Sequence, residues 1–344
     1  MPGVFGGHLL LPESSPWWPV VAPWQRWDVL WYQHIATNGY GYRGPEAAFS
    51  PLFPALEHVL GMSLGNFALA GLIISTAAFV VALLAVDALV KRDFGADVGR
   101  RATLYLAVSP TAFFFLAGYP EGLFLALGAA SMLAARRGHL LIAGSLVGAA
   151  ILCRNQGVFF LAPLAVEAAL RARAGWQRAV QGGLAFLIPV GIYGHYYAWI
   201  KSLGFSGGVL EIQQVYWRSD FGRPLEALVG SVQVIGTSLI DRPSELLNLA
   251  AALALAVSIP VMLGLRFPLS YTAYAGASLF GMTWRYSAYT PLMSDDRYLA
   301  VVFPFFVVLA IAAKRAWVGA LVLTFSLPLL ALLFIRFSQS EFVG

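Results

Sequence analysis

Long apolar runs separated by short clusters of charged residues make up most of the chain. About ten of these runs approach the roughly twenty residues that a helix needs to cross a bilayer. Several are shorter than a bilayer is thick, so we expect them to extend into their flanks or to lie beside re-entrant structure. The pattern therefore predicts an all-helical, polytopic membrane protein. The runs lie at 66–90, 102–117, 121–135, 140–153, 157–170, 180–200, 246–265, 269–282, 299–313 and 317–335.

Residues 1–344 are expected to form one membrane domain. Its two longest segments outside the apolar runs are expected to be external. No fixed-period repeat divides the chain. Residues 1–65 are interpreted as an N-terminal segment with a first external loop, and residues 201–245 as a second long external loop. Within the first segment, apolar residues recur at helical spacing over 54–65. This spacing predicts a short interfacial helix that leads into the first span.

Composition indicates that lipid, and not water, covers most of the surface. The 344 residues are 59% hydrophobic and only 11% charged, whereas about a quarter of the residues of a soluble domain are charged. The net charge of +5 does not indicate nucleic-acid binding, because the basic residues form short clusters between apolar runs. Because Cys153 is the one cysteine, no intrachain disulfide can form and no cysteine-based metal site is expected.

The charged residues are distributed unevenly between the two sets of loops. Loops that follow odd-numbered spans hold twelve of the 22 basic residues but only four of the 17 acidic ones. By the positive-inside rule these loops are predicted to be cytoplasmic. The first loop with Asp28, the corner at Glu121 and the loops at 201–245 and 284–297 are then extracytoplasmic. The acidic residues gathered on that face are a functional signal.

The segment 26–54, RWDVLWYQHIATNGYGYRGPEAAFSPLFP, is the least hydrocarbon-like part of the chain. It combines an acid, a histidine, two indoles and several prolines. Such a mixture is costly in lipid and unnecessary in a linker. We therefore interpret this segment as a catalytic loop.

Within this loop, residues 28–38 are predicted to form a short helix that stops at Gly39. Asp28, Trp31 and Tyr32 share one face of that helix, because residues three and four positions apart are neighbours on a helix surface. The prediction places a carboxylate among aromatic rings.

Asp28 is the candidate general base. Partial desolvation among aromatic rings raises the pKa of a carboxyl group and makes it a usable base, unless a basic neighbour such as Arg26 offsets the effect. The residues alone leave an alternative, in which Asp28 caps the helix and the tryptophans form an interfacial belt.

Four motifs in chain order resemble those of the PIG-V family, which contains the GPI mannosyltransferase II enzymes and their prokaryotic relatives. The first is RWDxxWYxxIAxxGY followed by FSPLFP, within residues 26–54. The others are SPTAFFFLAGYPEGLF at 109–124, CRNQG at 153–157 and DDRYLAVVFPFF at 295–306. Four ordered motifs are more specific than any one of them.

The resemblance implies both a fold and an activity. The fold is that of the GT-C membrane glycosyltransferases. The implied reaction is inverting transfer of mannose from a polyprenyl-phosphate-mannose donor to a glycolipid hydroxyl on the extracytoplasmic face. The acid of the first external loop, here Asp28, is the implied catalytic base.

Two departures from the family pattern stand out. The family usually has a span before the first loop and this chain shows none there, so we expect an abbreviated start. The corner that is commonly Tyr-Ser-Glu reads Tyr119-Pro120-Glu121. Proline stiffens the backbone at this corner but leaves the glutamate in place.

Departure of a phosphate from an anomeric carbon requires cations that stabilise the charge developing on the phosphate. Because the donor lipid lies in the membrane, these cations are expected at the ends of spans on the active face. Arg154 is the first candidate, at the external end of an apolar run with no acid nearby in the sequence, and Arg297 is the second. Alternatively, Arg154 snorkels to the headgroups, and Arg297 pairs locally with Asp295 or Asp296.

Further residues are candidates for substrate binding. Glu121 is one, although it could simply favour the N-terminus of the helix that follows it through the helix dipole. Gln and Trp side chains in the loop 201–245 suit sugar hydroxyls and sugar faces, although this loop could instead be a cap packed on the span ends. The full set of substrate-binding candidates is Trp27, Trp31, Tyr32, His34, Glu121, Asn155, Gln213, Gln214 and Trp217.

The sequence identifies no cofactor, although the adjacent acids Asp295 and Asp296 are candidates to hold a divalent cation, because hard cations take oxygen ligands. The expected partners are the polyprenyl-phosphate-mannose donor, a glycolipid acceptor and membrane lipid, and no nucleic acid. The alanine- and arginine-rich chain looks prokaryotic, so we expect a multi-pass protein of the plasma membrane with an extracytoplasmic active site.

Two other functions fit parts of the pattern. A transporter or flippase of lipid-linked sugars would also use intramembrane arginines and aromatic surfaces, but it predicts polar residues near the centres of several spans. Here the polar residues gather at the ends of the spans on one face. A GT-C enzyme that transfers a different sugar fits the same motifs.

Overall fold

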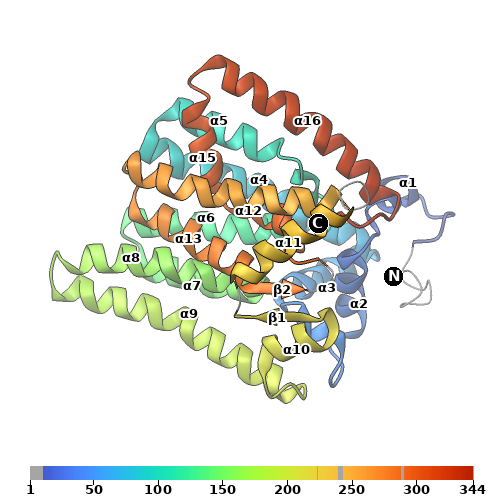
Figure 1. Cartoon of the computed structure of the whole chain (residues 1–344). Helices are drawn as coiled ribbons and strands as arrows, with labels where there is room; N and C mark the ends of the chain where they lie inside the picture. The colour runs from blue at the N-terminus through green and yellow to red at the C-terminus, as the bar shows by residue number, and fades with distance from the viewer. Residues whose placement is uncertain (1–10, 223, 239–242, 288–289, 344) are drawn as a thin grey trace.

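The computed structural model describes residues 11–222, 224–238, 243–287 and 290–343. Its body consists of long helices that run side by side (Figure 1). Each of the ten apolar runs forms helix over most of its length, which confirms the all-helical prediction. The helices of this body are α4 (Phe67–Phe94), α5 (Ala96–Ala107), α6 (Glu121–Arg137), α7 (Leu140–Cys153), α8 (Leu161–Ala172), α9 (Trp176–Ser202), α12 (Pro243–Gly264), α13 (Leu269–Trp284), α15 (Phe303–Ala312) and α16 (Ala316–Ser338).

Three helices in the described part of the chain, α4, α12 and α16, are long and apolar enough to cross a membrane by length and composition. Two of the expected spans are interrupted. The run at 102–117 is helical only to Ala107 and resumes as the 3-10 turn η4 (Ala112–Phe115) after Pro110. The run at 299–313 is divided at Val302 between α14 (Asp295–Val301) and α15, close to Pro304. Proline lacks the N–H that would continue the helix at these points.

Close backbone contacts hold the helical body together. A Cβ atom on Gly144 of α7 would lie 2.1 Å from the carbonyl oxygen of Ala185 in α9, and one on Gly122 of α6 would lie 2.8 Å from the carbonyl oxygen of Ser75 in α4. Small residues at such crossings let two helices approach each other. Aromatic rings fill the space between the helices, as in the stacked pair of Phe79 and Phe115, whose ring centroids are 4.3 Å apart.

Shorter elements cover one end of this body (Figure 1). They include α1 (Trp18–Val21), η2 (Ala22–Trp24), α2 (Asp28–Asn38), η3 (Pro45–Ala48), α3 (Leu52–Leu64), α10 (Gly208–Trp217) and α11 (Pro224–Ser238). Helix α3 confirms that a short helix forms at the predicted position, 54–65. The loop 201–245, of which residues 223 and 239–242 lie outside the described part, contains α10, α11 and the strand β1 (Ser219–Phe221).

Strand β1 pairs with β2 (Arg285–Ser287) in a small antiparallel sheet, with Asp220 opposite Tyr286. The sheet joins the loop 201–245 to the segment that follows α13, and it was not predicted from the sequence. Because strands of three residues carry little periodicity, no pattern marks them.

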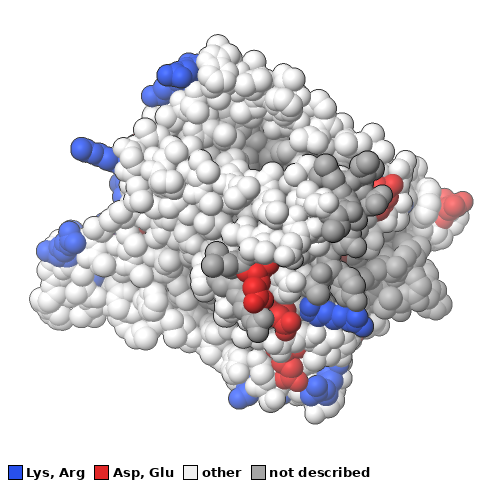
Figure 2. Space-filling model, viewed as in Figure 1, with Lys and Arg blue, Asp and Glu red and all other residues white. Residues whose placement is uncertain are grey.

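Charge divides the molecule between its two ends. Most visible lysine and arginine side chains lie at the end where α8 turns into α9 and α15 into α16, whereas the visible acidic side chains lie toward the end that carries α10 and the sheet (Figure 2). This division agrees with the two loop sets found in the sequence.

Candidate active site

Helix α2 begins at Asp28 and ends at Asn38, before Gly39 with a φ of 75°, as the sequence predicts. Trp27 precedes it with a φ of 51°, which is unusual for a bulky residue. Two long-range hydrogen bonds fix this conformation. The backbone N–H of Asp28 donates to the Tyr119 hydroxyl at 3.2 Å, and Trp27 Nε1 donates to the carbonyl of Glu341 at 3.1 Å.

The Asp28 side chain belongs to the first residue of α2 and not to its N-cap residue, which is Trp27. The Asp28 Oδ2 atom accepts a hydrogen bond from Arg297 Nη1 at 3.0 Å. The guanidinium of Arg297 is buried and lies over the rings of Phe114 and Tyr119, 5.3 Å and 5.5 Å from their centroids. Although burial alone would lower the pKa of Arg297, the carboxylates of Asp28 and Glu121 raise it above its ordinary value.

This arrangement removes the alternative in which Arg297 pairs locally. Its guanidinium reaches Asp28 and Glu121 and not the neighbouring acids. The Asp296 carboxylate accepts the backbone N–H of Arg297, at 2.6 Å, and not its guanidinium. Arg26 is not the neighbour of the Asp28 carboxylate either, since its guanidinium donates to backbone carbonyls, among them that of Ser338 at 3.0 Å.

Glu121 lies between two arginines. It starts α6 directly after Pro120, and its Oε1 atom lies 3.5 Å from Arg297 Nε and forms an ion pair with Arg154 Nη1. Arg154 is only 8% exposed, so it does not snorkel. No acid lies near Arg154 in the sequence, but Glu121, which is distant in sequence, is adjacent to it in the fold.

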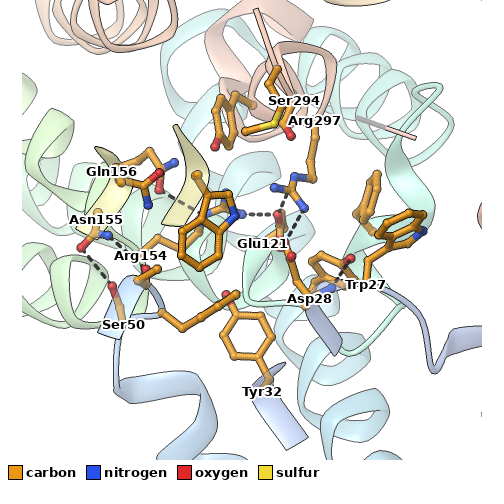
Figure 3. Close-up of a pocket in the computed structure, with 18 of the residues that line it drawn as sticks. Trp27, Asp28, Tyr32, Ser50, Glu121, Arg154, Asn155, Gln156, Ser294 and Arg297 are labelled. Atoms are coloured by element: carbon orange, nitrogen blue, oxygen red, sulfur yellow. Dashed lines mark hydrogen bonds and ion pairs between the residues drawn. The ribbon is translucent and has the colours of Figure 1, made fainter. Parts of the chain in front are cut away.

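The polypeptide turns sharply at Arg154, between the end of α7 and the start of η5 (Asn155–Phe160). Gly157 permits this turn, because a Cβ atom there would lie 2.3 Å from the backbone nitrogen of Ile151. Asp28, Arg297, Glu121 and Arg154 therefore follow one another across the site in an alternating chain of charges (Figure 3).

A third arginine, Arg285 of β2, completes the charged lining, and the sequence reasoning missed it. Its Nη1 atom donates to the Tyr298 hydroxyl at 3.3 Å. Arg154 and Arg285 both contact the Tyr298 ring, with their guanidinium carbons 5.5 Å and 5.4 Å from its centroid. In the described part of the cleft, the lining includes three guanidinium groups and the two carboxylates of Asp28 and Glu121, so it is suited to an anion.

These groups line a cleft of about 270 Å³ at the end of the body. Helix α10 covers the cleft. Arg43 of the first loop holds α10 in place, because it donates hydrogen bonds to Glu211 of α10 at 3.1 Å and to the carbonyl of Gly204, just before α10, at 2.6 Å. Gln213 and Trp217, one turn apart on α10, face the cleft. The predicted candidates that line it are Trp27, Asp28, Tyr32, Glu121, Arg154, Asn155, Gln213, Trp217 and Arg297.

Asn155 is held in place at the cleft wall. Its Oδ1 atom accepts hydrogen bonds from the hydroxyls of Ser50 at 3.3 Å and Tyr196 at 3.1 Å, and its Nδ2 atom donates to the carbonyl of Ala48 at 3.4 Å. These bonds connect the FSPLFP motif to the CRNQG motif.

Three predicted substrate-binding residues do not line the cleft. Trp31 is buried and stacks on Phe49 with a centroid distance of 5.7 Å. His34 lies 3.3 Å from Glu46. Gln214 is exposed on the side of α10 that faces away, because it is one residue from Gln213 on the helix.

The adjacent acids Asp295 and Asp296 also lie outside the cleft. Asp295 is 1% exposed, and Asp296 lines a separate apolar groove of about 430 Å³ between α12, α15 and α16. Among the residues that the structure describes, no group of three or more His, Cys, Asp or Glu side chains is arranged to hold a metal ion.

A second apolar groove, of about 520 Å³, adjoins the cleft. Its walls are mostly aromatic and aliphatic, with Phe159, Phe280 and Trp284 among them. Cleft and groove meet at a shared border. The residues common to both are Arg154, Asn155, Gln156, Gln213, Arg285 and Tyr298.

No family model matches the chain. Two curated proteins named GPI mannosyltransferase 2 are similar to it. The one from Drosophila pseudoobscura pseudoobscura is 27% identical over 235 residues, which are 62% of this chain and 51% of the relative. The one from Schizosaccharomyces pombe is 27% identical over 154 residues, 44% of this chain and 33% of the relative. The chain thus spans about half the length, or less, of the curated relatives that it matches.

Among solved structures, ArnT from Cupriavidus metallidurans, bound to undecaprenyl phosphate, is similar with a TM-score of 0.53 at 14% identity. The similarity covers 87% of this chain and 58% of ArnT. The chain therefore has the GT-C fold, and its sequence is similar to those of the GPI mannosyltransferase 2 proteins. As expected from its apolar helices, the chain is an integral membrane protein.

Proposed function

We propose that this protein transfers mannose from polyprenyl-phosphate-mannose to a hydroxyl of a glycolipid, with inversion, on the extracytoplasmic face of the membrane. In a prokaryote this membrane is the plasma membrane. The observation that carries the proposal is the border between the charged cleft and the apolar groove, where Arg154 and Arg285 lie. The mannosyltransferase names of the two relatives support the choice of sugar.

The donor is a molecule with three chemically distinct parts, and the site offers a matching region for each. The apolar groove suits the polyprenyl chain, because it is lined mainly by aromatic and aliphatic side chains. The arginines at the border suit the phosphate, since guanidinium groups bind phosphate oxygens in pairs. The cleft beyond them, with Asn155, Gln213 and Trp217, suits the sugar.

The reaction follows from this placement. The acceptor oxygen forms a bond to the anomeric carbon while the bond from that carbon to the phosphate oxygen breaks, and the electron pair leaves with the polyprenyl phosphate. The Asp28 carboxylate takes the proton of the acceptor hydroxyl. Arg154 and Arg285 stabilise the charge that develops on the phosphate.

We propose for Arg297 a role other than the donor-phosphate binding expected from the sequence. Because its guanidinium is held by Asp28 and Glu121, it is a positioning residue for the base. It does not line the apolar groove, whereas Arg154 and Arg285 do. We therefore place the donor phosphate at the latter pair.

The alternative of a lipid-linked sugar transporter receives no comparable support. The buried ion pairs of the described helical body lie near helix ends, at the active cleft and at a second cluster in which Arg136 contacts Asp93 at 2.8 Å and Glu167 at 3.4 Å. The sequence had indicated that polar residues gather at the span ends of one face only. In the structure the second cluster lies at the opposite end of α6 from Glu121, so polar residues gather at both ends.

The test is transfer by the purified protein in lipid nanodiscs, with radiolabelled polyprenyl-phosphate-mannose as donor and lipid extracted from the source membrane as acceptor. We expect label in a glycolipid product with wild-type protein and almost none with Asp28→Asn. Asp97→Asn is the matched control, because Asp97 is exposed at the other end of the body. Failure of the wild-type protein to transfer mannose would refute the proposed function.

A further inference from the structure

The charged groups of the cleft have a fixed order, and this order gives the cleft two chemically different ends. Asp28 contacts Arg297, Arg297 contacts Glu121, Glu121 contacts Arg154, and Arg154 Nε donates to Gln156 at 3.3 Å. At the Gln156 end the cleft continues into the apolar groove. Asp28 and Trp27 lie at the other end (Figure 3).

A C-terminal segment, residues 338–343, forms the wall at the Asp28 end. Phe342 and Val343 line the cleft, and neither lines the apolar groove. Phe342 packs edge-to-face against Trp27 with a centroid distance of 5.3 Å. Val343 is 4% exposed and packs with Val29 and Tyr119, so it anchors the segment to the cleft floor.

Several polar contacts hold the same wall in place. Arg26 Nε donates to the Ser338 carbonyl at 3.0 Å, and Trp27 Nε1 donates to the Glu341 carbonyl at 3.1 Å. Arg336 pairs with the Glu341 carboxylate at 2.6 Å. The strained backbone of Trp27, with its φ of 51°, is thus stabilised by contacts to a segment more than 300 positions away in sequence. Strain of this kind is typical of residues that serve a binding site.

We infer that Trp27, Phe342 and Val343 form the binding site for the acceptor, an amphiphile with a sugar headgroup. The inference rests on the proposed function. If the donor enters from the apolar groove with its phosphate at Arg154 and Arg285, its sugar points toward Asp28. In an inverting displacement the attacking hydroxyl approaches from the side opposite to the leaving phosphate, which is the side of Trp27 and Phe342.

The chemistry of this wall fits such an acceptor. Phe342 is 42% exposed, which leaves its ring open to a ligand. Aromatic faces accommodate the apolar faces of sugars and the first methylenes of a lipid chain. The adjacent Asp28 carboxylate is placed to accept the proton of a hydroxyl bound there.

The first test compares Phe342→Ala with wild-type protein, using octyl α-mannoside as acceptor probe at varied concentration. We expect the KM for octyl α-mannoside to rise about fivefold, the effect of one lost aromatic contact, while the KM for the polyprenyl-phosphate-mannose donor stays within about twofold. Trp317→Ala is the control, because Trp317 is 61% exposed at the far end of α16. An unchanged acceptor KM, or an equal rise of the donor KM, would overturn the inference.

The second test does not depend on turnover. Cys153 is buried and is the one native cysteine, so Phe342→Cys carries the one accessible thiol. Because Phe342→Cys also lacks the aromatic ring and should bind the probe more weakly, octyl α-mannoside is raised to near-saturating concentration. We then expect it to slow maleimide labelling of Phe342→Cys but not of Trp317→Cys. Protection without any mannosyl transfer by wild-type protein would refute the proposed function and leave the binding site standing. Absence of protection would refute the binding site.

Discussion

The Asp28 carboxylate accepts a hydrogen bond from Arg297 at 3.0 Å, although the two residues are 269 positions apart in sequence. The contact links α2 of the first loop to α14, which begins just before the ninth apolar run. A carboxylate that accepts a hydrogen bond from a guanidinium is held in one orientation. The pair therefore holds the proposed base ready to accept a proton, and Glu121 holds the guanidinium from its other side at 3.5 Å.

Asp28→Asn is predicted to lower kcat by about 10²- to 10⁴-fold, the range typical of a lost general base. The donor KM should change little, because Asp28 does not line the apolar groove or its border. Steady-state kinetics with varied donor measures both parameters. If the loss falls on the donor KM with kcat preserved, Asp28 contributes to donor binding and is not the base.

Arg285→Ala is predicted to raise the donor KM by about tenfold to a hundredfold, because a charged hydrogen bond to the phosphate is lost. Arg285→Lys should recover only part of this, since an ammonium group lacks the paired donors of a guanidinium. Arg100→Ala, an exposed arginine at the other end of the body, is the control. A normal donor KM in Arg285→Ala would show that the phosphate lies elsewhere.

Glu121→Gln is predicted to destabilise the protein more than Asp28→Asn. Glu121 is 1% exposed and neutralises both Arg154 and Arg297, so its removal leaves two buried cations with one remaining carboxylate. Breaking a buried ion pair costs about 3–5 kcal/mol. The Asp28 side chain is 31% exposed, so water can hydrate this position when the Asp28 charge is removed, and the loss of stability should be smaller. Thermal unfolding in detergent, compared between the two variants, measures the difference, and equal melting temperatures would contradict it.

Gly144→Ala is predicted to loosen the packing of α7 on α9. The added methyl group would lie 2.1 Å from the Ala185 carbonyl oxygen, so the helices must separate, at a cost of about 1–3 kcal/mol. Gly183→Ala is the matched control, because no atom lies within 4 Å of its Cβ position and alanine favours a helix. The melting temperature should fall in the first variant and stay equal or rise in the second. The opposite order would show that the two helices do not meet at Gly144.

Local features of the fold could be predicted from the sequence. Helix α2 has the predicted bounds because Asn38-Gly39 supplies its stop, and α3 follows from helical spacing of apolar residues. Asp28, Arg154 and Arg297 were singled out by charge in an apolar context, and all three line one cleft. Charge in lipid is rare enough to serve as a signal.

The remaining features depend on contacts that no local pattern encodes. Arg285 reaches the cleft through the pairing of β2 with β1, and Phe342 reaches it through hydrogen bonds from Arg26 and Trp27. His34 was predicted to be a substrate-binding candidate, but it lies beside Glu46 instead of in the cleft. Glu46 lies outside the helix of His34, so the sequence did not reveal this contact. Long-range pairing decided each of these positions.

The last prediction concerns pH and Asp296. Burial raises the pKa of Asp296 from 3.8 to about 6, with the backbone N–H and the charge of Arg297 limiting the rise. Because the folded pKa lies above the unfolded one, the folded protein binds the proton more tightly. This contribution to stability is complete below about pH 4 and is lost as the pH rises through about 6, by at most about 3 kcal/mol.

Asp296→Asn removes this titration, so its stability should fall less than that of the wild type as the pH rises from about 4 to about 7. The measurement is the melting temperature of both proteins in one detergent across this range. Other carboxylates titrate in both proteins, so the difference between the two curves reports Asp296 alone. Parallel curves would show that the Asp296 carboxylate is solvated, and therefore that the groove beside α12 and α16 admits water.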